Sequence, residues 1–257
     1  MTADRGVVLV TGAAGGIGRA IVETSAQRGW SVLATDRVPD ATFAAGGQAR
    51  IRYVAADVTS EEQMAAVVAD ARALGPLVGA IANAGVLAEG FSPLVDAAPA
   101  GWRQTLEVNV VGVLVTLQAA ARELVRTGGG RLLATASVAG LRAEPQLPAY
   151  CASKAAVISI VRSLALELGA AGITVNAVAP GPVGTEAQQR VIEERGRPRL
   201  EDETAAQRFE RHRAEGRPLA RMATPNDVAE AFAWLLSDAA AYVTGEVLTV
   251  DGGSVLA

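Results

Sequence analysis

A tyrosine and a lysine lie four residues apart in the segment from Tyr150 to Lys154. Side chains at positions i and i+4 share one face of a helix, so the Tyr150 phenol and the Lys154 ammonium would lie side by side. A phenol has an ordinary pKa of about 10, and a neighbouring cation favours its ionised form. The pair therefore predicts a proton-transfer site, although the same spacing also occurs on many surface helices.

The rest of the chain supplies elements that would position this pair. Half of the 257 residues are hydrophobic and only 4% are aromatic, which suits a buried parallel sheet covered by Ala-rich helices. Strands are expected at 7–10, 31–35, 51–55, 79–82, 131–136, 174–179 and 247–250, and helices at 17–28, 61–74, 102–126, 149–168 and 225–236. This alternation predicts one α/β domain over residues 1–257, with a Rossmann-like doubly wound parallel sheet of about seven strands and helices on both faces. A charged insertion at 186–217 is expected to form a helical lid over the substrate.

Charge and cysteine content narrow the classes of function. The formal charge is −4 and no long basic block occurs, so nucleic acid is not expected as a partner. Cys151 is the single cysteine, which excludes an intramolecular disulfide and fits a reducing cytoplasm. No uninterrupted apolar segment approaches the length that spans a membrane, and no spacing indicates a metal site. The single histidine, His212, lies in the charged insertion and is expected to be solvated there.

A glycine-rich turn follows the first predicted strand and opens the first predicted helix. Gly12, Gly16 and Gly18 have the spacing Gly-x-x-x-Gly-x-Gly, and Gly15 adds a further glycine. Glycine lets the backbone approach a pyrophosphate closely, and the free amides of the helix N-terminus face its negative charge. A P-loop is excluded because no Lys-Ser/Thr pair follows. The turn therefore predicts a dinucleotide site.

The second predicted strand ends at Asp36. A carboxylate there accepts hydrogen bonds from the adenosine ribose and repels a 2′-phosphate, which favours NAD over NADP. Arg37 leaves NADP as an alternative, because its side chain could pair with a 2′-phosphate. Asp57 and Val58 follow the third strand and are expected to hold the adenine, and Asn83-Ala84-Gly85 follow the fourth and would form a floor of small residues under the cofactor.

Taken together, these motifs make the chain similar to the short-chain dehydrogenase/reductase family in its common form. The matching pieces occur in the family's order and cover nearly the whole chain: Thr11, Gly12, Gly16 and Gly18, then Asp57, Asn83-Ala84-Gly85, Asn109, Ser137, Tyr150 with Lys154, and the run from Pro180 to Thr185. The resemblance implies an oxidoreductase that transfers a hydride between a secondary alcohol and a nicotinamide cofactor.

The resemblance also implies a role for each matching residue. Tyr150 would be the general acid/base. Lys154 would lower the pKa of the phenol and bind the nicotinamide ribose, Ser137 would bind the substrate oxygen, and Asn109 would hold a water that relays protons. The cofactor would be bound by Gly12, Gly15, Gly16, Ile17, Gly18, Asp36, Arg37, Asp57, Val58, Asn83, Ala84, Gly85, Tyr150, Lys154, Pro180, Gly181, Val183 and Thr185.

The substrate is the least determined part of the prediction. The resemblance places Val138, Arg142, Gln146 and Leu147 around it, where Arg142 either pairs with a substrate carboxylate or is a surface charge. A cyclic diol or a hydroxy acid is expected. The alternatives are an NADPH-dependent reductase of ketones or 3-oxoacyl groups, and a catalytically silent nucleotide-binding protein. The resemblance also implies a homotetramer formed through the last helix and strand.

Overall fold

The computed structural model describes residues 5–38, 49–88, 90–186, 188, 204 and 218–256. Within these residues, seven strands form one sheet: β1 (Val7–Thr11), β2 (Ser31–Asp36), β3 (Ile51–Ala55), β4 (Leu77–Ala82), β5 (Gly130–Thr135), β6 (Ile173–Pro180) and β7 (Val247–Val250). Their order is β3-β2-β1-β4-β5-β6-β7, and every neighbouring pair is parallel. The predicted doubly wound sheet is confirmed.

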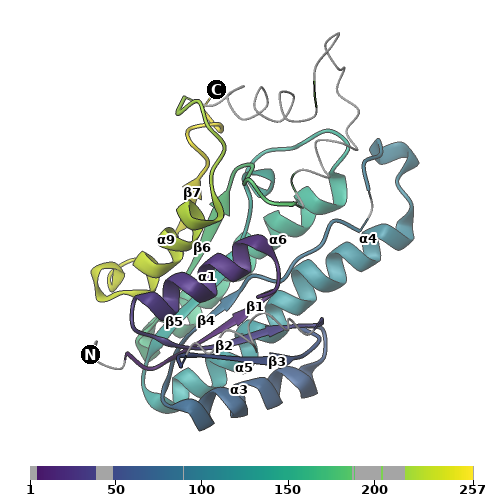
Figure 1. The fold of residues 1–257 in the computed structure, drawn as a ribbon. Coiled ribbons are helices and arrows are strands. Elements are labelled where there is room, and N and C mark those ends of the chain that lie inside the picture. The colour runs from purple at the N-terminus through teal and green to yellow at the C-terminus, as the bar shows by residue number, and fades with distance from the viewer. Residues whose placement is uncertain are drawn as a thin grey trace.

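Helices cover both faces of the sheet (Figure 1). On one face lie α1 (Gly16–Gln27) and α9 (Pro225–Leu236), side by side, and on the other lie α3 (Glu61–Leu74), α5 (Gly112–Thr127) and α6 (Pro148–Leu168). Alternate residues of β1 point to opposite faces of the sheet. Val8 and Val10 lie in the core beneath α1 and α9, and Leu9 lies in the core beneath α3, α5 and α6. Burying one such side chain contributes about 1.5–3 kcal/mol, which is why this strand is apolar at consecutive positions.

The order of the strands creates a crevice. From β1 the chain builds outwards through β2 and β3, and then returns to place β4 on the other side of β1. The connections after β1 and β4 therefore diverge, and ligands of such sheets bind where the strands end at this divergence. Asn83 follows β4 and the glycine-rich turn follows β1, so both lie at this point.

The predicted long helix at 102–126 is wrong as a single α-helix. It consists of α4 (Pro99–Leu106), the π-helical turn η2 (Glu107–Val111) and α5. Gly112 begins α5 at a close approach, since a Cβ there would lie 2.6 Å from Cγ2 of Val58. Apolar spacing does not separate a π turn from an α-helix. Such turns are often found at functional sites, and this one contains Asn109.

Two helical stretches, Pro99–Thr127 and Pro148–Ala171, are long and apolar enough by composition to cross a membrane, which corrects the expectation that no segment is. Their apolarity has another explanation, because α5 packs against β4 and α6 packs against β6. Core helices of α/β folds often have this length and apolarity, so the two stretches are weak evidence for a membrane span. The predicted lid at 186–217, with His212, lies outside the described residues except at 186, 188 and 204.

Candidate active site

A cleft of about 1550 Å³ lies at the carboxyl ends of the strands. Pockets for drug-sized ligands measure roughly 300–1,000 Å³, so this cleft has room for a cofactor and a substrate together. Every residue predicted to bind the cofactor lines it. Ser137 also lines the cleft, so the structure brings together segments that are distant in the sequence.

The glycine-rich turn is packed too tightly for side chains at two positions. Gly12 has a φ of +65°, and a Cβ there would lie 2.6 Å from Cα of Ala84. A Cβ on Gly18 would lie only 2.0 Å from the carbonyl oxygen of Gly12. Gly15 differs, because its Cβ would make an ordinary 3.6 Å contact. Gly12 and Gly18 are therefore required by the turn itself.

The N-terminus of α1 opens into the same cleft. Its N-cap, Gly15, has no side chain to accept hydrogen bonds from the first amides of the helix. These amides carry the positive end of the helix dipole and suit a pyrophosphate. Arg19, one turn further on, also lines the cleft and was not predicted.

Two carboxylates lie at the far end of the cleft from α6. Asp36 accepts hydrogen bonds from the backbone amides of Ala14 at 3.1 Å and Arg37 at 2.7 Å. Asp57 accepts from the amide and the hydroxyl of Thr59 at 2.9 and 2.8 Å. These two bonds, with a smaller contribution from the Arg37 charge, hold the pKa of Asp57 below its usual value.

These features fit a dinucleotide. The helix amides suit its phosphates, and the Asp36 carboxylate suits a ribose diol. Gly85 leaves space in front of the catalytic residues, since a Cβ there would lie 3.4 Å from Nζ of Lys154 and 3.3 Å from Oδ1 of Asn109.

Tyr150 and Lys154 lie in the first two turns of α6, as their spacing predicted. Nζ of Lys154 is 5.7 Å from the centroid of the Tyr150 ring and donates a hydrogen bond to the carbonyl oxygen of Thr135 at 2.8 Å. Lys154 is buried, and burial lowers its pKa to about 8. The ammonium form therefore still predominates at neutral pH.

Burial raises the pKa of the Tyr150 phenol in the protein alone, because it disfavours the phenolate. The lowering of this pKa by Lys154 that the resemblance implied stays a prediction. A hydrogen bond with the Ser137 side chain acts in the opposite direction without reversing the shift. The phenol therefore keeps its proton at neutral pH in the protein alone.

Ser137 is held in place by the turn that follows it. Its Oγ accepts a hydrogen bond from the amide of Ala139 at 3.1 Å at the start of the short helix η3 (Val138–Gly140). Only 8% of Ser137 is exposed. Its hydroxyl also hydrogen-bonds to the Tyr150 phenol, which lines the same cleft.

Asn109 lies behind the cleft and is fully buried. Its Oδ1 accepts from the amide of Val86 at 2.7 Å, and its Nδ2 donates to the carbonyl oxygen of Val86 at 2.9 Å and to Oγ of Ser153 at 3.1 Å. Ser153 in turn donates to the carbonyl oxygen of Tyr150 at 2.7 Å. Asn109 is thus tied to the backbone of the helix that carries Tyr150, and its role in a proton relay stays a prediction.

The predicted substrate residues separate into two groups. Val138, Arg142 and Leu147 line the cleft, whereas Gln146 is exposed and is absent from the lining. Arg142 is already engaged, since Nε donates to Glu144 at 3.2 Å and a terminal nitrogen donates to the carbonyl oxygen of Ser254 at 2.9 Å.

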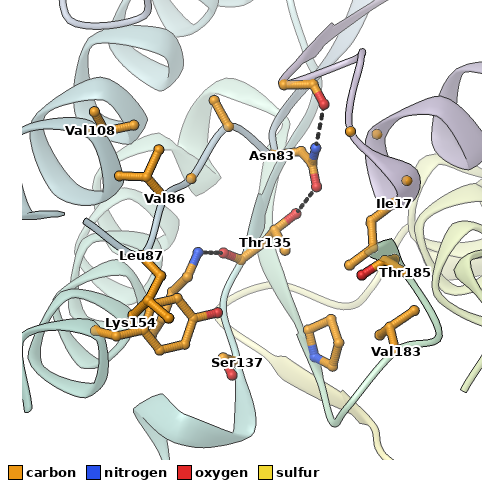
Figure 2. A pocket seen from close by; sticks show the side chains of 18 of the residues that line it. Ile17, Asn83, Val86, Leu87, Val108, Thr135, Ser137, Lys154, Val183 and Thr185 are labelled. Carbon is orange, nitrogen blue, oxygen red and sulfur yellow. Dashed lines mark hydrogen bonds between the residues drawn. The ribbon is translucent and has the colours of Figure 1, made fainter. Parts of the chain in front are cut away.

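Several lining residues were not predicted. They include Gln104, Glu107, Val108, Met222 and Ser254. No local pattern marks them, because they reach the cleft from α4, η2 and segments near the C-terminus. Figure 2 shows that opposite walls of the cleft come from distant parts of the sequence. Ile17, Val183 and Thr185 lie on one side, Lys154 and Leu87 lie on the other, and Thr135 and Asn83 lie between them. Among the described residues, no group of His, Cys, Asp or Glu could hold a metal ion.

The site and the fold agree with the comparisons. Residues 12–255 match the family model described as enoyl-(acyl carrier protein) reductase. The chain is 35% identical to 2-(S)-hydroxypropyl-CoM dehydrogenase 3 of Xanthobacter autotrophicus, over 96% of this chain and 95% of the relative. It is 38% identical to cis-4-hydroxycyclohexanecarboxylate dehydrogenase of Sinomonas cyclohexanicum, with the same coverage of both chains.

A solved structure of a short-chain type dehydrogenase/reductase from Mycobacterium ulcerans matches with a TM-score of 0.87 and 33% identity, over 100% of this chain and 92% of the other. The chain therefore belongs to the short-chain dehydrogenase/reductase family and is an oxidoreductase that acts on CH–OH groups with a nicotinamide cofactor.

Proposed function

We propose that the protein is a cytoplasmic NAD-dependent dehydrogenase that oxidises an uncharged secondary alcohol, with a cyclic diol as the leading case. One observation carries the proposal: Ser137, Tyr150 and Lys154 line the same cleft as the glycine-rich turn. A proton carrier and a dinucleotide site in one cleft are what a hydride transfer between an alcohol and a nicotinamide requires.

The residues of the chain provide the proton chemistry. When bound, the oxidised nicotinamide supplies the hydride acceptor. Ser137 holds the alcohol oxygen near the Tyr150 phenol, and Tyr150 in its phenolate form removes the alcohol proton. Because burial raises the pKa of Tyr150, the phenolate needs a cation beside it, and the Lys154 ammonium supplies one below pH about 8.

Two observations support NAD over NADP. Asp36 places a carboxylate at the end of β2, where it would repel a 2′-phosphate. Arg37 lies near enough to Asp57 to lower its pKa, so the Arg37 charge is partly offset by a carboxylate on the same wall. A 2′-phosphate would thus meet two carboxylates and one guanidinium.

The charges that line the cleft support an uncharged substrate. Arg19 and the residues predicted to hold the cofactor, Lys154 among them, lie along the cleft. The other described charged side chains that line it are Arg142, Glu107, Glu144 and Glu186. Carboxylates outnumber the one guanidinium, and Arg142 already donates to Glu144. An anionic substrate would be repelled more than attracted, which disfavours the hydroxy acid and favours the diol.

A panel of alcohols tests this function. Cyclic diols, simple secondary alcohols and cyclic hydroxy acids are each assayed with NAD and with NADP, and the reduced cofactor is followed by absorbance. We expect kcat/KM to be about tenfold or more higher for a diol than for the matching hydroxy acid, and for NAD than for NADP. A preference for the acid contradicts the substrate class, and equal rates with NADP contradict the cofactor. No turnover of any alcohol supports a silent protein.

We also propose that the chain forms a homotetramer through α9 and β7. Trp234 on α9 is 41% exposed, and Tyr242 just before β7 is fully exposed, which leaves large aromatic surface unpaired in the single chain. Size-exclusion chromatography with light scattering is expected to give four times the mass of the chain. The variant Trp234→Glu should give a smaller species, whereas a wild-type monomer contradicts the proposal.

A further inference from the structure

Thr135, at the end of β5, contacts both Lys154 of the catalytic group and Asn83 beside the glycine-rich turn. Its hydroxyl donates a hydrogen bond to Oδ1 of Asn83 at 2.9 Å, and its carbonyl oxygen accepts one from Nζ of Lys154 at 2.8 Å. Thr135 is 7% exposed. Figure 2 shows these bonds as one chain that runs from Lys154 through Thr135 to Asn83 and on towards the first strand.

Asn83 continues the chain to the glycine-rich turn. Its Nδ2 donates to the carbonyl oxygens of Thr11 and Gly12 at 3.1 and 3.2 Å. An amide group has two donors on nitrogen and an acceptor on oxygen, so this orientation requires a donor facing Oδ1. The Thr135 hydroxyl is that donor. Rotation of the amide by half a turn would set its oxygen against two carbonyl oxygens.

The packing around Asn83 transmits its position to the turn. A Cβ built on Gly12 would lie 3.0 Å from Nδ2 of Asn83, and a Cβ built on Gly18 would lie 2.8 Å from the same atom. Nδ2 thus occupies space that these two glycines leave open. Movement of the Asn83 amide towards these glycines would push it against the backbone of the turn that is predicted to hold the pyrophosphate.

We propose that the Thr135 hydroxyl is a positioning group for cofactor binding, which acts through Asn83 on the glycine-rich turn. The backbone carbonyl of the same residue anchors Lys154 separately, so loss of the hydroxyl leaves the proton carrier in place. The inference rests on the nicotinamide cofactor of the family and not on the proposed choice of NAD or of substrate.

The test compares Thr135→Val, which keeps the shape and removes the hydroxyl, with Thr135→Ser, which keeps the hydroxyl. The Kd of NAD, and of NADP in parallel, is measured by calorimetry, with thermal unfolding of each variant. Thr135→Val is expected to raise the Kd of the preferred cofactor about tenfold, because Oδ1 of Asn83 loses its partner. Thr135→Ser should bind within about twofold of wild type.

Two further readouts separate positioning from a structural role. At saturating cofactor, kcat of Thr135→Val should stay close to wild type, since Lys154 bonds to the backbone. In an Asn83→Ala background, Thr135→Val should have no additional effect on Kd. An unchanged Kd with a lower Tm overturns the proposal, as does an equal loss in both Thr135 variants or a loss that persists without Asn83. Should Thr135→Val not fold, Thr135→Ala carries the same expectations.

Discussion

Replacement of Tyr150 by phenylalanine is expected to lower kcat by about 10²- to 10⁴-fold, the range for loss of a general acid/base. The Tyr150 phenol hydrogen-bonds to Ser137 and lines the same cleft as Lys154, which no other proton carrier among the described residues is shown to do. Phenylalanine keeps the ring and the packing and removes only the hydroxyl. Steady-state rates, followed by absorbance of the reduced cofactor, measure the loss.

The control for this variant is binding of the cofactor itself. The Kd of NAD should change by less than about threefold, since the hydroxyl holds no part of the glycine-rich turn. Tyr242→Phe serves as the matched substitution, because Tyr242 does not line the cleft and phenylalanine keeps its ring; this variant is expected to leave kcat unchanged. Turnover by Tyr150→Phe within about tenfold of wild type would show that another group moves the proton.

Substitution of Gly18 by alanine is expected to weaken NAD binding by about 100-fold and to lower Tm. The added Cβ would lie 2.0 Å from the carbonyl oxygen of Gly12, which is backbone and has no rotamer to yield. The turn must open by a large shift, and the amides of α1 then no longer converge on a pyrophosphate. Forced overpacking of this kind costs about 1–3 kcal/mol.

Gly15→Ala is the matched variant in the same turn. Its Cβ would lie 3.6 Å from the same Gly12 oxygen, an ordinary contact, and Gly15 has a negative φ of −74° that alanine adopts readily. The Tm of Gly15→Ala should therefore stay near wild type, and its Kd for NAD should rise far less than that of Gly18→Ala. Equal behaviour of the two variants, whether both bind or both fail, contradicts the steric explanation.

Much of the fold was predictable because its signals are local. The apolar run of β1 and the amphipathic pattern of α3 are set by burial along a strand and by the repeat of a helix. The bounds of α3, α9, β3 and β7 agree with the expected ranges. The π turn around Asn109 was not predicted, because the same apolar spacing suits a continuous helix. The residue that follows this turn is also placed by a tertiary contact, since a Cβ on Gly112 would lie 2.6 Å from Cγ2 of Val58, which is distant in the sequence.

For the site, the sequence by itself determined the residues whose relation is local. Tyr150 and Lys154 share a helix face at i and i+4, and Gly12, Gly16 and Gly18 lie within one turn, so short-range geometry places each group. The tertiary structure alone decided the partners that act through space. Thr135 meets Asn83 because β4 and β5 are neighbours, and Arg142 meets Ser254 because the C-terminal segment folds back on the cleft. The raised pKa of Tyr150 belongs with these, because burial results from the packing of the whole chain, whereas spacing records only neighbours along it.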